Sequence, residues 1–145
     1  MSLTLCEIDI GSPEYHAAVR LREKVLRAPL GLVFSEAELA VEPDCFHLAA
    51  IAEGEVVAIL LLQPIEAGTV RMRQVAVNPD RQRSGSGSQL VRFAEGFARE
   101  HGFRRMVAHA RGTAVGFYQR LGYATEGESF MENTIPHVLV AKALE

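Results

Sequence analysis

A polar segment rich in glycine, Ser84 to Ser88, lies between two stretches of regular pattern. Thr69 to Val77 has the alternation of a strand, and the apolar residues from Gln89 to His101 recur with helical spacing. On composition alone Ser84 to Ser88 would suit a flexible linker. Its place at the carboxyl end of a strand and before a helix instead predicts a turn of the kind that binds ligands in α/β folds.

Such a turn favours anions. The first N–H groups of a helix have no partner in the helix, and the helix dipole places partial positive charge there. Gly85 and Gly87 let the backbone approach a ligand closely. Arg81, Gln82 and Arg83 add two cations and an amide donor. A phosphate or pyrophosphate is therefore the expected ligand.

Two common nucleotide motifs do not fit this turn. A P-loop needs a lysine after its second glycine, and none follows here. A dinucleotide fingerprint needs a third glycine where Leu90 stands. What remains is the pattern Q/R-x-x-G-x-G/A over Gln82 to Gly87. In this pattern the sequence resembles the GNAT superfamily, the acetyl-CoA-dependent N-acetyltransferases.

The resemblance extends beyond the turn. Val75 to Pro79 is similar to the central strand of the family and its exit, and Ala114 to Tyr123 is similar to its A-x-x-F-Y-x-x-x-G-F/Y segment. Met131 to Leu144, which contains Ile135-Pro136-His137, resembles the carboxyl end of one bacterial branch. Together these segments cover most of residues 69–144. The first 68 residues are compatible only in the order of their predicted elements.

The resemblance implies a binding site for acetyl-CoA. The pyrophosphate of the cofactor would lie on the backbone amides of Gln82, Arg83, Ser84, Gly85, Ser86 and Gly87, with Ser88 nearby. The pantetheine arm would pair, as an added strand, with Val75, Ala76 and Val77. A backbone N–H near Val75 would polarise the acetyl carbonyl. No metal ion is predicted.

The resemblance also implies that Tyr118 is the catalytic acid. The tyrosine of the F-Y pair usually protonates the departing thiolate in this family, and a phenol suits that task because its ordinary pKa is about 10. A half-buried structural aromatic is the alternative. Arg111 stands where many members carry asparagine. Its charge would hold a cofactor phosphate or an acidic group of the substrate, or would simply face solvent.

The general base is left open by the sequence. Some members of the family place a carboxylate in the central strand, but here that stretch holds Arg71 and Arg73. His109 and His137 are the remaining side-chain candidates, each with a structural role as its alternative, and a relay through bulk water is a third route. We expect direct attack in a ternary complex, because neither Cys6 nor Cys45 lies in a motif for an acyl-enzyme.

Other functions compatible with the same residues are a non-catalytic acyl-CoA sensor and a transferase of a longer acyl group. A regulatory domain that binds nucleotide or phosphate is disfavoured by the missing lysine and glycine. The acceptor is expected to be a small-molecule or peptide amine, selected by the region from Ala28 to Asp44, which matches nothing specific. A homodimer is common for such folds, although no residue indicates it.

The elements that must position these residues form a mixed α/β fold of one domain, residues 1–145. The predicted order is strand, two helices, three strands, helix, strand, helix and two strands, with the central parallel strands splayed apart. The expected strands are residues 3–10, 46–52, 56–63, 69–77, 104–110, 123–131 and 136–142. The expected helices are residues 14–27, a short helix opened by the capping box Ser35 to Glu38, a helix from residue 89, and residues 113–121.

Composition excludes several classes of protein. The 145 residues are 48% hydrophobic and 23% charged, which is typical of a globular domain and not of a disordered chain. The net charge of −3 disfavours a general nucleic-acid binder. The longest apolar run, Val56 to Leu62, is far shorter than a membrane span. With no leader pattern and two cysteines, the chain is expected to be cytoplasmic.

Overall fold

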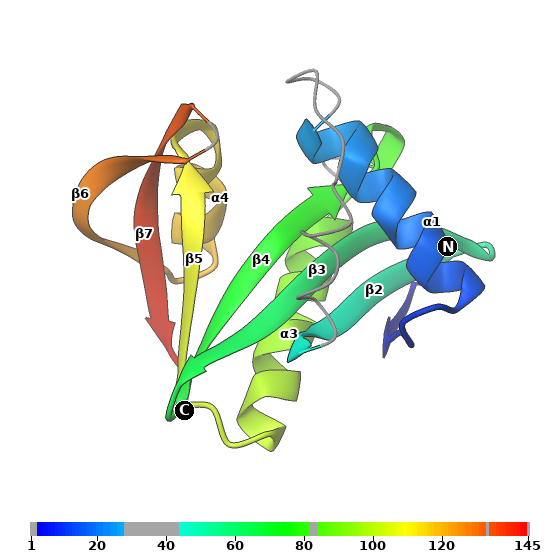
Figure 1. Cartoon of the computed structure of the whole chain (residues 1–145), viewed down its shortest axis with the longest axis horizontal. Coiled ribbons are helices and arrows are strands. Elements are labelled where there is room, and N and C mark those ends of the chain that lie inside the picture. Colours follow the sequence, from blue (N-terminus) through cyan, green and yellow to red (C-terminus); the bar gives the residue numbers. More distant parts are fainter. Residues whose placement is uncertain (1–2, 28–43, 82–83, 133, 145) are drawn as a thin grey trace. The chain divides into compact units, whose positions relative to one another are not determined.

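The computed structural model describes residues 3–27, 44–81, 84–132 and 134–144 (Figure 1). Its seven strands form a sheet in the hydrogen-bonded order β1-β2-β3-β4-β5-β7-β6. The strands are β1 (Thr4–Glu7), β2 (Phe46–Ala52), β3 (Glu55–Glu66), β4 (Thr69–Val77), β5 (Arg105–Arg111), β6 (Ala124–Glu132) and β7 (Ile135–Ala143). The helices are α1 (Pro13–Arg22), α3 (Ser86–Glu100) and α4 (Val115–Arg120), with a π-helical turn at Glu23–Arg27 and 3₁₀ turns at Pro79–Arg81 and Gly112–Ala114. The predicted mixed α/β class is confirmed.

The chain forms two compact units. Unit 1 comprises Met1–Gln63 and Gln74–Ala94, and unit 2 comprises Pro64–Arg73 and Glu95–Glu145. The prediction of a single domain stays a prediction. The short helix expected at Ser35 to Glu38 lies outside the described residues.

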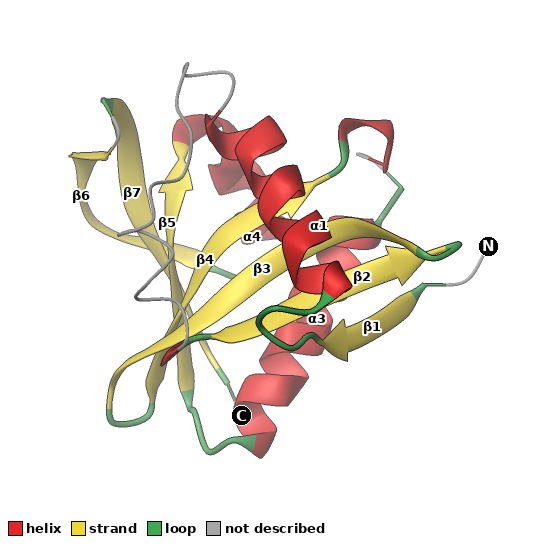
Figure 2. Cartoon of the chain, turned by 45° about the vertical axis from the view of Figure 1, so that its right-hand side comes forward, coloured by secondary structure: helices red, strands yellow, loops and turns green. Residues whose placement is uncertain are grey.

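Unit 1 is built on the antiparallel strands β1, β2 and β3. Ser12 caps α1, since its Oγ accepts a hydrogen bond from the Tyr15 N–H at 3.1 Å. Ala18 and Leu21 of that helix belong to a buried cluster with Ala49, Ile59, Leu61 and Ala76. The alternate residues of the two strands, including Leu48 and Leu60, are equally buried. Figure 2 shows why: α1 crosses one face of β2 and β3, and α3 lies behind them.

Some predicted boundaries in unit 1 were wrong. The strand expected over residues 3–10 ends at Glu7, because the chain turns where the Ser12 N–H donates to the Asp9 carbonyl. The helix expected to reach Arg27 is α-helical only to Arg22 and continues as the π-helical turn. The strand expected to end at Gln63 continues through the exposed Pro64 to Glu66.

Unit 2 holds the parallel part of the sheet. Thr69 to Met72 of β4 pair in parallel with Arg105 to Ala108 of β5, and among the described residues that register ends there. Strand β7 pairs antiparallel with both β5 and β6. Met106, Ala108 and Ala110 are almost fully buried, whereas His109 between them keeps 25% of its side chain exposed. The two faces of β5 therefore have different surroundings.

Gln74 interrupts the regular geometry of β4. Its φ of 58° lies in the left-handed region, which a side chain other than glycine seldom adopts and which costs about 1–3 kcal/mol. The sequence predicted regular alternation over Thr69 to Val77, but the strict alternation does not run through Gln74. The predicted splay of β4 and β5 beyond Met72 stays a prediction.

Candidate functional site

The chain passes from β4 to α3 through the segment Asn78 to Ser88, called here the β4–α3 turn. Its start is fixed to β3, because the Asn78 N–H donates to the Val57 carbonyl at 2.8 Å. The Arg81 N–H then donates to the Asn78 carbonyl at 2.8 Å, and the Ser84 N–H to the Arg81 carbonyl at 3.1 Å. Gln82 and Arg83 lie outside the described residues. The described part is thus an ordered connection and not a linker.

Helix α3 begins at Ser86, three residues before the predicted start at Gln89. Ser86, Gly87 and Ser88, expected in the loop, form its first turn. The reason is local: the Ser84 Oγ accepts from the Ser86 N–H at 3.4 Å, as an N-cap does, and the Gly85 carbonyl accepts from the Gln89 N–H at 2.9 Å. The amino end of the helix therefore lies closer to the glycines of the motif than the sequence predicted.

Gly85 has a φ of 87°, which suits glycine and strains other residues. A Cβ at this position would meet only the Gln89 Nε2, at 3.7 Å, so the surroundings of Gly85 are open. Ser86 is buried, and its hydroxyl lies 2.8 Å from that of Ser84. Ser84 and Gly85 are exposed, whereas Ser86 and Gly87 are buried, so the exposed part of the described turn lies at its glycine of positive φ.

The predicted partners of the pantetheine arm end β4 in unit 1. Ala76 is buried in the cluster beneath α1, whereas Val75 and Val77 are half-buried. They follow directly after the irregular residue Gln74. Their pairing with the pantetheine arm stays a prediction.

Tyr118 lies on α4 in unit 2 and is only 5% exposed. Burial raises the pKa of its hydroxyl to about 12, so it holds its proton at any physiological pH. Its ring makes edge contacts with Phe117 and Tyr123 at 5.2 and 5.6 Å between centroids. A protonated, positioned phenol can act as an acid but not as a base.

A buried polar group that sequence reasoning missed packs beside Tyr118. Glu95 of α3 accepts hydrogen bonds from the Tyr123 hydroxyl at 2.9 Å and from the Lys142 Nζ at 3.1 Å. The same Nζ donates to the Leu121 carbonyl at 2.7 Å. Burial, and then the charge of Glu95, raises the pKa of Tyr123. This group joins α3, β7 and the end of α4.

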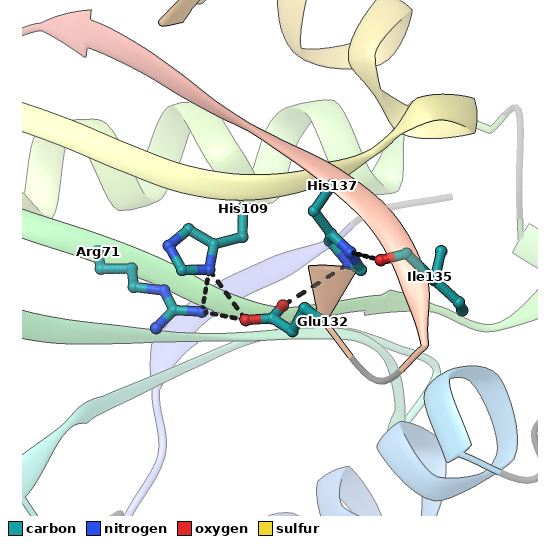
Figure 3. A network of polar contacts seen from close by, with 5 residues as sticks. All are labelled: Arg71, His109, Glu132, Ile135 and His137. Carbon is teal, nitrogen blue, oxygen red and sulfur yellow. Dashed lines mark hydrogen bonds and ion pairs between the residues drawn. The ribbon is translucent and has the colours of Figure 1, made fainter. Parts of the chain in front are cut away.

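A second polar group lies on the other face of β5 (Figure 3) and is called here the Glu132 cluster: Arg71, His109, Glu132 and His137. The Glu132 Oε1 lies 3.0 Å from the His109 Nδ1 and 3.3 Å from the Arg71 Nη2. Its Oε2 lies 3.6 Å from the His137 Nε2. The Arg71 Nη2 is 2.7 Å from the His109 Nδ1. Both histidines that the sequence offered as bases therefore share one carboxylate.

Burial alone would raise the pKa of Glu132. The hydrogen bond from His109, together with the charges of His109, Arg71 and His137, outweighs burial and lowers that pKa. The carboxylate is therefore ionised at neutral pH. Sequence reasoning did not single out Glu132. One signal was available in the sequence. Glu132 stands five residues before His137, between two predicted strands, and the register of β6 and β7 brings these residues together.

Arg111, Cys6 and Cys45 are the remaining residues that the sequence analysis considered. Arg111 ends β5 opposite His137 in the strand register and precedes the 3₁₀ turn without capping it through its side chain. Burial, with a smaller effect of Glu14, raises the pKa of the Cys6 thiol, which disfavours a reactive thiolate. Cys45 is buried. None of the helices in the described part of the chain has the length and apolarity needed to cross a membrane.

A mixed sheet in this order, with a glycine-rich turn into a helix after β4 and a tyrosine on the following short helix, defines a class of acyl-group transferases. The family model of the acetyltransferase (GNAT) family matches residues 12–123. The chain therefore belongs to the GNAT acetyltransferase family, as its motifs predicted.

Relatives and solved structures agree with that family. A candidate acetyltransferase of Bacillus subtilis (strain 168) is 29% identical over 133 residues, 89% of each chain. The crystal structure of a candidate N-acetyltransferase from Lactobacillus plantarum has a TM-score of 0.86 at 24% identity, over 100% of both chains. A GNAT family acetyltransferase from Elizabethkingia anophelis with acetyl-CoA bound has a TM-score of 0.76 at 19% identity, over 98% of both chains. The two structures establish a shared fold.

Proposed function

We propose that this protein is an N-acetyltransferase that moves the acetyl group of acetyl-CoA to an amine by direct attack in a ternary complex. The observation that carries the proposal is the β4–α3 turn, where the motif of the family coincides with a capped helix start and an open backbone at Gly85. The acceptor is a small-molecule or peptide amine. The protein acts in the cytoplasm and needs no metal ion.

In this proposal the β4–α3 turn and the end of β4 bind the cofactor through their backbone. The amides of Gln82 to Gly87 hold the pyrophosphate, and Ser88 lies near it. The amino end of α3 adds the favourable field of its dipole. Val75 to Val77 pair with the pantetheine arm, and an N–H near Val75 polarises the acetyl carbonyl.

Tyr118 is the acid of the proposed reaction. The amine attacks the thioester carbon, the C–S bond breaks, and Tyr118 gives its proton to the departing sulfur. Burial keeps the phenol protonated at neutral pH, so the proton is available when the thiolate forms, while the raised pKa makes Tyr118 a weaker acid than a free phenol. Arg111 adds a cation for a cofactor phosphate. Transfer through a cysteine is not part of the proposal, and the raised pKa of Cys6 supports its omission.

Thermal melts with acetyl-CoA and CoA test the cofactor site. A ligand that binds only the folded state adds about 2.7 kcal/mol at a hundredfold excess over its Kd. For a chain of 145 residues the melting midpoint should rise by about 5–10 °C. Gly85→Asp should abolish this rise, because it places a Cβ and a negative charge where the phosphates would lie.

Gly85→Asn is the matched control, since it has the same size and the same backbone demand without the charge. Its unliganded melting midpoint should equal that of Gly85→Asp, and it should retain more of the acetyl-CoA shift. A full shift in Gly85→Asp would place the cofactor elsewhere. Acetylation of ethanolamine, glucosamine, spermidine and short peptides, compared with transfer from longer acyl-CoAs, then identifies the acceptor and the acyl group.

A further inference from the structure

Of the two histidines in the Glu132 cluster, His137 has both ring nitrogens engaged. Its Nδ1 lies 2.7 Å from the Ile135 carbonyl, which can only accept, so this nitrogen carries a proton. Its Nε2 faces the Glu132 Oε2 at 3.6 Å. The side chain is 6% exposed. His137 therefore has no ring nitrogen available for a substrate.

His109 differs in each of these respects. Only its Nδ1 contacts the cluster, and its side chain is 25% exposed. Figure 3 shows Nε2 pointing away from Glu132, and within the described part of the chain that nitrogen has no hydrogen-bond partner. The Phe130 ring packs edge-on at 4.9 Å between centroids and limits rotation of the imidazole. One nitrogen is fixed and the other is accessible.

The two neighbours of His109 make opposite demands on its Nδ1. The Arg71 Nη2, 2.7 Å away, can only donate, whereas the ionised Glu132 Oε1, 3.0 Å away, can only accept. The Arg71 Nη2 also has the same Oε1 as an acceptor, at 3.3 Å. We take Nδ1 to donate to Glu132, which leaves the lone pair on Nε2.

The two faces of β5 separate this histidine from Tyr118. Lys142 of β7 is paired in register with Met106 of β5, so the two side chains lie on the same face of the sheet. Lys142 also contacts Glu95 beside Tyr123. Tyr118 therefore lies on the face of the even-numbered residues of β5. His109 is odd-numbered and points to the opposite face.

We infer that His109 is the general base of the proposed transfer, that Glu132 holds it in the reactive tautomer, and that Arg71 positions Glu132. This inference rests on the proposed function. The protonated amine gives one proton to Nε2, which passes it to water. The free amine then forms the C–N bond as the C–S bond breaks. As the amide forms, its nitrogen loses the second proton to solvent. Solvent then returns a proton to Tyr118, which has given its own to sulfur. One proton is released overall.

Nitrogen NMR of the ¹⁵N-labelled full chain tests the tautomer without any acceptor. His109→Gln identifies the His109 signals by their loss. The wild-type spectrum should show His109 protonated on Nδ1, and Glu132→Gln should abolish that preference. A wild-type His109 protonated on Nε2 would overturn the inference, because the accessible nitrogen would then be a donor.

Rates with acetyl-CoA and spermidine, or whichever amine from the screen reacts fastest, test the role itself. His109→Gln should lower kcat by about 10²–10⁴ while the acetyl-CoA shift in melting midpoint is retained. Glu132→Gln should also lower kcat, by less than His109→Gln does and with the acetyl-CoA shift retained, because the imidazole loses the acceptor that fixes its tautomer. A residue that only supports the fold would change the melting midpoint and leave kcat unchanged.

His101→Gln is the matched control. His101 is an exposed histidine on the helix end that stacks on Phe97, outside the cluster, and its loss should leave the rate unchanged. An unchanged rate in His109→Gln, with transfer and cofactor binding intact in the wild type, would refute the inference alone. Failure of the wild type to bind acetyl-CoA or to acetylate any amine would refute the proposed function. The NMR measurement of the His109 tautomer would still test the arrangement of the Glu132 cluster.

Discussion

The β4–α3 turn and the Glu132 cluster are assembled in opposite ways. The turn comes from one continuous segment, and its proposed role is carried by the backbone, with Gly85 open and Ser86 buried. The cluster comes from four strands, β4, β5, β6 and β7, and consists entirely of side chains. A backbone site tolerates changes of side chain but not of backbone space or charge. A side-chain site depends on single atoms.

Among the substitutions that test this comparison, the replacement of Tyr118 is expected to have the largest effect on the rate. Tyr118→Phe removes one oxygen from a side chain that is already 5% exposed, so the packing around it should persist. We expect kcat to fall by about 10²–10⁴ with acetyl-CoA affinity nearly unchanged. Steady-state rates between pH 6 and 9 check this. An unchanged kcat would remove Tyr118 from the role of acid.

The buried group around Glu95 should show a large effect on stability. Lys142→Met leaves Glu95, which is 4% exposed, without its cation. We expect a loss of about 2–3 kcal/mol, below the usual ~3–5 for a fully buried pair because Lys142 is partly exposed. Urea unfolding measures this loss. Adding Glu95→Gln to Lys142→Met should recover part of it, and a single variant as stable as the wild type would contradict the argument.

Glu132 should make stability depend on acidic pH. Its pKa is lowered in the folded state from 4.5, so its contribution is complete above that value and is lost as pH falls through the folded pKa. The melting midpoint of the wild type should therefore fall more steeply below pH 4.5 than that of Glu132→Gln. Parallel curves for the two proteins would show that the cluster does not hold the carboxylate ionised.

The smallest effect is expected from the cysteines. Cys6→Ser with Cys45→Ser should leave turnover within about threefold, because direct attack needs no protein thiol. Mass spectrometry after mixing with acetyl-CoA should show no acetyl-enzyme. A trapped acetyl-cysteine, or loss of activity in the double variant, would replace direct attack with a two-step route.

The same contrast explains what the sequence could predict. Glycine spacing after a strand indicates a backbone site directly, so the turn and the family were found. The start of α3 was misplaced by three residues, because the Ser84 cap and the left-handed Gly85 shift it. The Glu132 cluster could not be predicted, since Arg71 and Glu132 are 61 residues apart and meet only through the strand registers. The left-handed Gln74 leaves no signal in a sequence of ordinary strand residues.

The burial of Tyr118 and Tyr123 also gives the protein an optical property. The chain has no tryptophan and three tyrosines, so its near-ultraviolet absorbance comes mainly from phenols. Tyr118 ionises at about pH 12 when folded and near 10 when exposed, and burial raises the pKa of Tyr123 in the same direction. Between these values the unfolded chain releases protons that the folded chain retains, so stability falls as pH rises. The tyrosinate absorbance of these two residues is therefore a label-free signal for the opening of unit 2.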